Sequence, residues 1–257
     1  PKFPKKINHN VFSLLCGAPG NDNYYHWFFD VLPRYYLFRK IFKFKNNDYF
    51  VVPNIKHEFQ RESLKLLNIK NLINAYDVKH LKAKNIYIIP LDITGNKFPS
   101  KWIINEHKKF FLTKRKKKRK SINIYISRKD SHNKLRSISN ENEVLEILKK
   151  NNFKEVRLSD LNMTNKINLF QSAKTIVGQF GAGLANTIFS KKKTTVIEIK
   201  NKNTGNLYKN IILNSGLNYK SLSFKRLNYR KSFKNFDGTI HVEPKRLKKL
   251  LSTIKKN

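Results

Sequence analysis

Apolar positions in the second half of the sequence change between two spacings, which predicts strands and helices in turn. Short runs of β-branched and aromatic residues predict strands, and each is followed by a segment with apolar residues at helical spacing. The predicted strands are 121–127, 153–158, 175–178, 194–199 and 219–222, and the predicted helices are 140–150, 165–173, 182–189, 207–215 and 244–255. This alternation predicts an α/β domain with a doubly wound, mostly parallel sheet. Asn140, followed by Glu143 three residues later, predicts a capping box at the start of helix 140–150.

The first half mixes the same two patterns less regularly. Residues 23–32 are rich in aromatic side chains and predict a helix that Pro33 breaks or kinks. The other predicted elements are strands 49–52 and 85–89, each ended by a proline, and helices 57–67 and 101–112. The first half is therefore also expected to contain both helices and strands.

Seven consecutive basic residues, 114–120, separate the two halves. Such a run repels itself and cannot lie in a core, so a solvated linker is the favoured interpretation, with a phosphate or membrane-surface contact as the alternative. The run predicts a boundary between a domain of residues 1–113 and a domain of residues 114–257.

The overall charge is strongly positive, with 54 Lys and Arg against 17 Asp and Glu, a net charge of +37. A surface this basic attracts phosphates, nucleic acid and anionic membranes. The lysines are scattered among many Asn and Ile residues, however, as they are when codon usage favours A and T. The charge therefore does not select a function, and specific nucleic-acid binding is not expected.

Two further absences bound the class of protein. No apolar run reaches about 18 residues, so no transmembrane helix is expected. Cys16 is the single cysteine, which excludes an internal disulfide and a cysteine-built metal site. A cytoplasmic location fits best, with peripheral contact at the inner membrane face as a further expectation.

A glycine-rich segment, residues 178–186, follows one predicted strand and opens a predicted helix. Small residues such as Gly181, Ala182 and Gly183 let the backbone approach a ligand, and free amides at a helix start favour a phosphate. Their spacing is not the dinucleotide-binding fingerprint. Phosphate binding and a simple packing turn both remain open.

Three charged residues lie near the ends of predicted strands of the second half. Arg128 follows one strand, and Arg136 lies in the loop before the next helix. Arginine donors suit a phosphate group, although either residue could be an ordinary surface charge. Glu198 lies inside an apolar strand, where it could bind a ribose hydroxyl or pair with a lysine.

In the first half, His26 and Asp30 are four residues apart, so a helix would place both on one face. A carboxylate beside an imidazole can act as a general base on a sugar hydroxyl. Neighbouring aromatic side chains such as Tyr25 and Trp27 could exclude water or stack on a sugar ring. The alternative is an ordinary His–Asp pair on the surface of an aromatic helix.

The sequence lacks the motifs of metal-dependent chemistry. It has no Asp-x-Asp triplet to anchor a metal–nucleotide complex, and it has neither an H-E-x-x-H motif nor paired cysteines for zinc. A sugar transferase of this composition would have to neutralise its leaving diphosphate with arginine and backbone amides.

Taken together and in order, these residues resemble glycosyltransferase family 61, which includes bacterial capsular-polysaccharide proteins and eukaryotic enzymes that add N-acetylglucosamine or xylose. The resemblance runs from about residue 23 to residue 219. The matching residues are Asn23, His26 and Asp30 with Leu32 and Pro33, then Ser127, Arg128, Arg136, Ile138, Asn140 and Glu141, then Gly181, Ala182, Gly183, Leu184, Phe189 and Glu198. Phe180 occupies the position where the family has a histidine.

The resemblance implies a GT-B-like pair of Rossmann-type domains and an inverting, metal-independent transfer without a cofactor. It implies a nucleotide-sugar donor held by the second domain through Arg128, Arg136, residues 181–183, Asn186 and Glu198. Asp30 with His26 would act as the base, beside the acceptor-side residues Asn23, Tyr25 and Trp27. The acceptor would be a glycan or a lipid-linked glycan in bacterial surface polysaccharide synthesis. The alternative is a non-catalytic protein that binds nucleic acid or acidic glycans.

Overall fold

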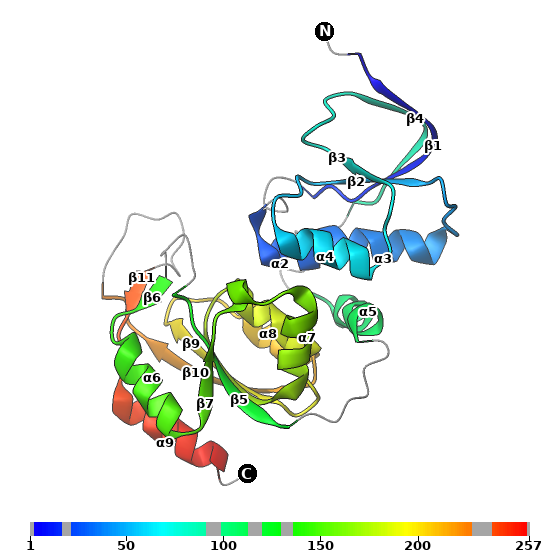
Figure 1. Cartoon of the computed structure of the whole chain (residues 1–257). Helices are drawn as coiled ribbons and strands as arrows, with labels where there is room; N and C mark the ends of the chain where they lie inside the picture. Colours follow the sequence, from blue (N-terminus) through cyan, green and yellow to red (C-terminus); the bar gives the residue numbers. More distant parts are fainter. Residues whose placement is uncertain are drawn as a thin grey trace. The chain divides into compact units, whose positions relative to one another are not determined.

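The computed structural model describes residues 3–16, 22–90, 99–112, 120–129, 136–227 and 238–255. The chain divides into two compact units, unit 1 (Pro1–Lys114) and unit 2 (Arg115–Asn257). Each unit is α/β with parallel strands (Figure 1), which confirms the predicted α/β class. Of the basic run 114–120, only Lys120 is among the described residues.

Unit 1 is built on a four-stranded sheet in the order β3-β2-β1-β4, and all neighbouring strands in it are parallel. The strands are β1 (Lys5–Ser13), β2 (Tyr49–Val52), β3 (Leu72–Asn74) and β4 (Leu81–Ile88). The helical segments are α2 (Tyr24–His26), the π-helix η1 (Trp27–Val31), α3 (Leu32–Ile41), α4 (Glu58–Leu66) and α5 (Lys101–Phe111). Pro33 therefore does not break the helix, which was one of the two predicted outcomes; the chain passes through one π-helical segment just before Pro33 and continues as α3.

Aromatic rings fill the core of unit 1. Phe12 on β1 is buried, and five rings lie 5.0–5.6 Å from its ring, those of Phe38, Phe42, Phe44, Phe50 and Tyr87. Burial of a large aromatic side chain removes 150–250 Å² of surface, at roughly 25 cal/mol per Å². This cluster fixes β1 in the middle of the sheet, between β2 and β4.

Because β2 and β4 lie on opposite sides of β1, the strand order of unit 1 reverses between β1 and β4. Ligands of open parallel sheets bind beyond the carboxyl ends of the strands at such a switch point. The segment that leaves the carboxyl end of β1 leads into α2 and η1 (Figure 1). The topology thus makes the residues of α2 and η1 candidates for the site of unit 1.

Unit 2 has a five-stranded parallel sheet in the order β10-β9-β8-β5-β7 and a separate parallel pair, β11-β6. The strands are β5 (Ile122–Ile126), β6 (Arg136–Ile138), β7 (Phe153–Val156), β8 (Ala173–Gln179), β9 (Thr195–Asn201), β10 (Asn218–Phe224) and β11 (Gly238–Ile240). The helices are α6 (Glu141–Lys150), η2 (Leu158–Asp160), α7 (Met163–Ser172), η3 (Ala182–Phe189), α8 (Leu207–Asn214) and α9 (Pro244–Lys255).

Helices cover both faces of the five-stranded sheet, as a doubly wound sheet requires. On one face, α6 and α9 bury Val144, Leu148, Leu247 and Leu251 against strand residues such as Ile197. In Figure 1, α7 and α8 lie on the other side of the sheet, where both helices contact η3. The strand order reverses between β5 and β8, so the switch point of unit 2 lies where the loops after these two strands begin.

Three local predictions for unit 2 need correction. The segment from Ala182 to Phe189 is a 3₁₀-helix and not an α-helix. Arg136 does not lie in a loop but begins β6, whose partner β11 is far away in the sequence. Asn140 does not cap α6 with its side chain, as the predicted capping box would require; its Nδ2 instead donates to Glu143 and to the Val242 carbonyl. No helix in the described part of the chain is long and apolar enough to cross a membrane.

Candidate functional site

The switch point of unit 2 brings Arg128 and Gly181 into direct contact. Arg128 follows the carboxyl end of β5, and Gly181 follows the carboxyl end of the neighbouring strand β8. A Cβ atom on Gly181 would lie 3.1 Å from Cζ of Arg128 and closer still to its Nη1. The absence of a side chain at position 181 is therefore what makes room for the guanidinium.

Arg136 approaches the same turn from β6. Its Nη1 donates to the carbonyl oxygen of Phe180 at 3.3 Å, and its guanidinium carbon lies 5.4 Å from the centre of the Phe180 ring. The Phe180 ring is buried and contacts the ring of Tyr208 edge to face, with centroids 4.9 Å apart. The side chain of Phe180 is thus an aromatic support for an arginine.

Both arginines lie close enough to the buried Tyr208 hydroxyl to affect its pKa. Burial raises the pKa of the Tyr208 hydroxyl, and the positive charges of Arg136 and Arg128 oppose that rise. Two guanidinium groups thus converge at the carboxyl ends of β5 and β8, next to the start of η3. This concentration of positive charge beside backbone amides is suited to an anion such as a diphosphate.

The remaining residues of the glycine-rich segment shape its backbone. Ala182 and Gly183 are half-buried at the start of η3, and the Leu184 amide donates to the Gly181 carbonyl. Asn186 is buried, and its Nδ2 donates to the Gly183 carbonyl at 3.0 Å. Asn186 therefore holds the turn from within.

Glu198 lies on β9 in register with Gly178 of β8, and its side chain is fully buried. Its Oε2 accepts a hydrogen bond from the Tyr219 hydroxyl at 2.6 Å and lies 3.5 Å from the Lys200 ammonium. Burial raises the pKa of Glu198, against the lowering effects of Tyr219 and Lys200. The ion pair with a lysine that the sequence suggested is therefore present, with Lys200, and Oε1 makes no hydrogen bond within the described residues.

In unit 1 the segment after β1 carries the predicted His–Asp pair. Asn23 caps α2, with its Oδ1 accepting from the Tyr25 amide at 2.8 Å. Nδ1 of His26 lies 2.5 Å from Oδ2 of Asp30, and the side chains are 34% and 14% exposed. The pair is partly accessible to solvent, which a group that reacts with a substrate hydroxyl must be.

The aromatic residues beside this pair divide between surface and core. Tyr25 is half-buried, with its ring 5.2 Å from that of His26. Trp27 is fully buried, and its Nε1 donates to the Ser63 hydroxyl of α4 at 2.8 Å. Trp27 therefore anchors the segment to α4 and does not present a ring to an acceptor, as its place beside His26 had suggested.

A buried histidine missed in the sequence supports the same segment. His107 on α5 is fully buried, with Nε2 2.7 Å from the Phe28 carbonyl oxygen and Nδ1 2.8 Å from the Tyr36 hydroxyl. No local signal marks it, because its partners lie more than 70 residues away in the sequence. Burial lowers the pKa of His107 to about 3, so the ring is neutral at physiological pH.

This lowered pKa makes the stability of unit 1 depend on pH. Below pH 6.5 an unfolded chain protonates His107 while the folded unit does not, so stability is fully present above pH 6.5 and lost as the pH falls toward 3. The expected loss from this residue is about 3 kcal/mol at pH 4.5. Urea unfolding followed by the fluorescence of Trp27 and Trp102, both in unit 1, measures it. The variant His107→Gln should lose correspondingly less stability over this range, and equal losses would contradict the assignment.

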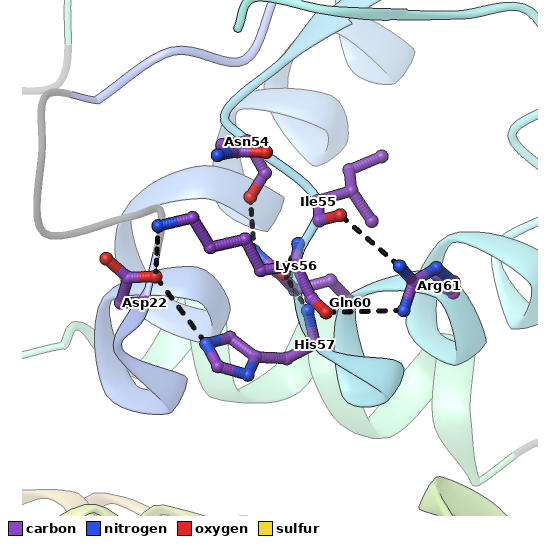
Figure 2. Close-up of polar contacts among 7 residues, drawn as sticks. All are labelled: Asp22, Asn54, Ile55, Lys56, His57, Gln60 and Arg61. Carbon is purple, nitrogen blue, oxygen red and sulfur yellow. Dashed lines mark hydrogen bonds and ion pairs between the residues drawn. The ribbon is translucent and has the colours of Figure 1, made fainter.

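The loop between β2 and α4 forms a second polar cluster at the carboxyl edge of this sheet (Figure 2). The buried Gln60 accepts from the amides of Lys56 and His57, each at 2.8 Å, and donates to the Asn54 carbonyl. Figure 2 shows the side chains of Lys56 and His57 directed toward Asp22, whose Oδ1 lies 3.2 Å from the Lys56 ammonium and 3.6 Å from Nε2 of His57. This cluster links Asp22, the residue before Asn23, to a loop whose backbone is held by Gln60.

Comparison with known proteins adds the last finding on the site. The sequence model of the family Glycosyltransferase 61 matches residues 24–197, a span that includes His26, Asp30, Arg128, Arg136 and Gly181. A search of curated proteins finds no significant match.

Proposed function

The chain belongs to glycosyltransferase family 61 and is a glycosyltransferase, and from that premise we propose that it moves a sugar from a nucleotide-sugar donor to a hydroxyl group of a glycan acceptor. We further propose that the transfer inverts the anomeric carbon and needs no metal ion. The two units would be the two Rossmann-type domains of a GT-B-like enzyme. Support for that reading comes from the parallel sheet of each unit and its switch point.

One observation carries the donor part of the proposal, namely the contact of the Arg128 guanidinium with Gly181 at the switch point of unit 2. Arg136 adds a second guanidinium at the neighbouring Phe180 carbonyl. In the proposed complex both arginines and the amides of residues 181–183 hold the diphosphate. Glu198 is fully buried, so it would shape the nucleoside or sugar pocket from within, through its contact with Tyr219.

Phe180 is compatible with this role although the family has a histidine at its position. Its carbonyl and its ring both contact Arg136, and its ring also packs on Tyr208. Arginine is held in one orientation by such contacts, which lowers the entropy that binding a phosphate must cost. We infer that this site keeps its second arginine in place without the histidine.

Unit 1 supplies the base in the proposed reaction. The acceptor oxygen attacks the anomeric carbon while its proton passes to the carboxylate of Asp30, whose other contact is His26. The bond from the anomeric carbon to the diphosphate oxygen breaks, and its electron pair leaves with the diphosphate. A single displacement of this kind inverts the anomeric centre, and Arg128 and Arg136 neutralise the charge that develops.

The setting of the reaction is proposed from the resemblance and the charge. Members of the family on the bacterial side act in capsular polysaccharide synthesis, so a glycan or lipid-linked glycan is the proposed acceptor. The net charge of +37 would favour contact with an anionic membrane surface.

A thermal-shift panel of nucleotide sugars and nucleoside diphosphates, run with a chelator, tests the proposed function. A donor that binds the folded state at a hundredfold excess over its Kd stabilises it by about 2.7 kcal/mol, which raises the Tm of a unit of this size by roughly 5–10 °C. Calorimetry is the suitable readout, because both tryptophans lie in unit 1 and would not report on unit 2.

The chain offers a matched control for the donor site in Arg246. Its guanidinium lies 4.7 Å from the Phe224 ring, as that of Arg136 lies over Phe180, but it belongs to α9. Arg136→Ala should abolish the nucleotide-dependent shift, whereas Arg246→Ala should retain it. No response to any nucleotide, with salt-sensitive stabilisation by DNA or acidic glycans, would instead favour a polyanion-binding protein.

A further inference from the structure

The helix that carries Asp30 changes its hydrogen-bond register in the turn just before Pro33. The Leu32 amide donates to the Trp27 carbonyl, five residues back, which is the π-helical spacing. Pro33 has no amide hydrogen, so one carbonyl on the preceding turn must lose its helical partner. In α-helical register that carbonyl belongs to Phe29, and in π-helical register it belongs to Phe28.

His107 replaces the donor that Pro33 lacks. Its Nε2 lies 2.7 Å from the Phe28 carbonyl oxygen. Because a carbonyl can only accept, Nε2 must carry the hydrogen, and Nδ1 then accepts from the Tyr36 hydroxyl at 2.8 Å. The buried ring is thus a neutral Nε2–H tautomer with both nitrogens engaged, which agrees with its lowered pKa of about 3.

The register change decides which way Asp30 faces. One extra residue in a turn rotates everything after it by about 100° around the helix axis. With the π turn in place, Trp27 and Val31 are buried within it, and Tyr36 and Phe38 are buried after it. Asp30 stays partly exposed beside His26. Without the π turn, either the aromatic face of α3 or the carboxylate would be turned away from its present place.

Three contacts from other elements hold this arrangement. His107 of α5 donates to the Phe28 carbonyl, and Arg34 of α3 donates to the Asp30 carbonyl. The Ser63 hydroxyl of α4 accepts from the Trp27 indole. Of the three, only the His107 contact supplies a donor that the helix backbone lacks, because Pro33 has no amide hydrogen. This makes His107 the contact on which the π register depends most directly.

We propose that His107, held by Tyr36, is a positioning residue that fixes the π turn and thereby keeps Asp30 against His26 for its reaction with the acceptor. The inference rests on the proposed role of Asp30 as the base. His107 itself is fully buried and touches no substrate, so its effect on turnover passes through the backbone at Phe28.

The test compares His107→Leu with His107→Gln, and follows both turnover and the imidazole of His26 by ¹⁵N-histidine NMR. Gln places an amide nitrogen near the position of Nε2 and can donate to Phe28, whereas Leu cannot. At saturating substrates His107→Leu should slow turnover by roughly tenfold to a hundredfold, since small misplacements of a reacting group have effects of that size. His107→Gln should remain within about threefold of the parent, and the KM for the donor should stay within twofold in both variants.

The NMR arm separates the inference from the proposed function. In His107→Leu the His26 ring signals should move, because the partner Asp30 is displaced, while in His107→Gln they should stay near their original positions. If Asp30→Asn retains turnover but His107→Leu still moves the His26 signals, the positioning inference stands and the base assignment falls. Unmoved His26 signals in folded His107→Leu would overturn the inference, and so would equal turnover in the Leu and Gln variants when Asp30→Asn does abolish turnover.

Tyr36→Phe provides a second variant in case His107→Leu does not fold. It removes one of the two contacts that favour the Nε2–H tautomer, the hydroxyl that donates to Nδ1, and leaves the ring stacked on Phe110 at 5.0 Å. The Nε2–H tautomer of His107 should then lose population in the NMR spectrum, with a fall in turnover of a few-fold. An unchanged tautomer together with unchanged turnover would also count against the proposal.

Discussion

The variant Asp30→Asn is expected to slow glycosyl transfer by a factor of about 10² to 10⁴, because it removes the carboxylate that accepts the acceptor proton. Asparagine has nearly the same shape and can still meet Nδ1 of His26, which lies 2.5 Å from Oδ2 in the parent. The change is therefore confined to proton acceptance. Steady-state kinetics with saturating donor and acceptor measure the loss.

Two controls make this result specific. Asp77→Asn makes the same chemical change at an exposed position after β3, and turnover should be unaffected. His26→Asn should cost less than Asp30→Asn if the carboxylate takes the proton and the imidazole only orients it. Near-normal turnover of Asp30→Asn, with donor binding intact, would remove Asp30 as the base. A larger loss in His26→Asn would transfer the role to the imidazole.

Gly181→Ala is expected to weaken nucleotide-diphosphate binding by roughly tenfold to a hundredfold with little loss of stability. The new methyl group would occupy the space of the Arg128 guanidinium, which is the mobile end of a long side chain and can move away. Displacing one charged donor from a phosphate costs about 1.5–3 kcal/mol, which corresponds to the stated range. Isothermal titration calorimetry with the donor found in the nucleotide panel measures it.

The other glycines of unit 2 give this prediction its controls. At Gly205 an added Cβ meets no atom within 4 Å, so Gly205→Ala should bind donor like the parent. At Gly178 it would press on the side chains of Leu184 at 3.0 Å and Ile126 at 3.4 Å, which tests the effect of a tight methyl group away from the arginine. Undiminished affinity in folded Gly181→Ala would contradict the placement of Arg128 at the diphosphate.

The sequence allowed a good prediction of unit 2 because its strands are short apolar runs between amphipathic helices. The predicted strand 175–178 and helix 165–173 lie within two residues of β8 and α7. The strand β1 escaped notice because residues 5–10 are polar or basic apart from Ile7 and only the last part of the strand is buried. The strands β6 and β11 have three residues each and pair across about 100 positions, which no local pattern can show.

The candidate site was predictable in its charged residues and unpredictable in its supports. Arg128, Arg136 and Gly181 follow from residue type and strand ends, and the structure brings them together. The π register of η1 was not predictable, since it depends on a buried donor 79 positions away. The burial of Trp27 likewise depends on Ser63 of α4, so its sequence neighbours gave the wrong environment.

The order in which the core of unit 2 is completed has a consequence for synthesis of the chain. All described elements of unit 1 precede residue 112, so unit 1 can fold on the ribosome while unit 2 is still being translated. In unit 2 the apolar sheet face that includes Ile197 and Leu222 is covered in part by Leu247 and Leu251 of α9. Until α9 emerges from the ribosome, that face of the sheet is exposed. We therefore expect the nascent chain to need a chaperone most while unit 2 still lacks α9.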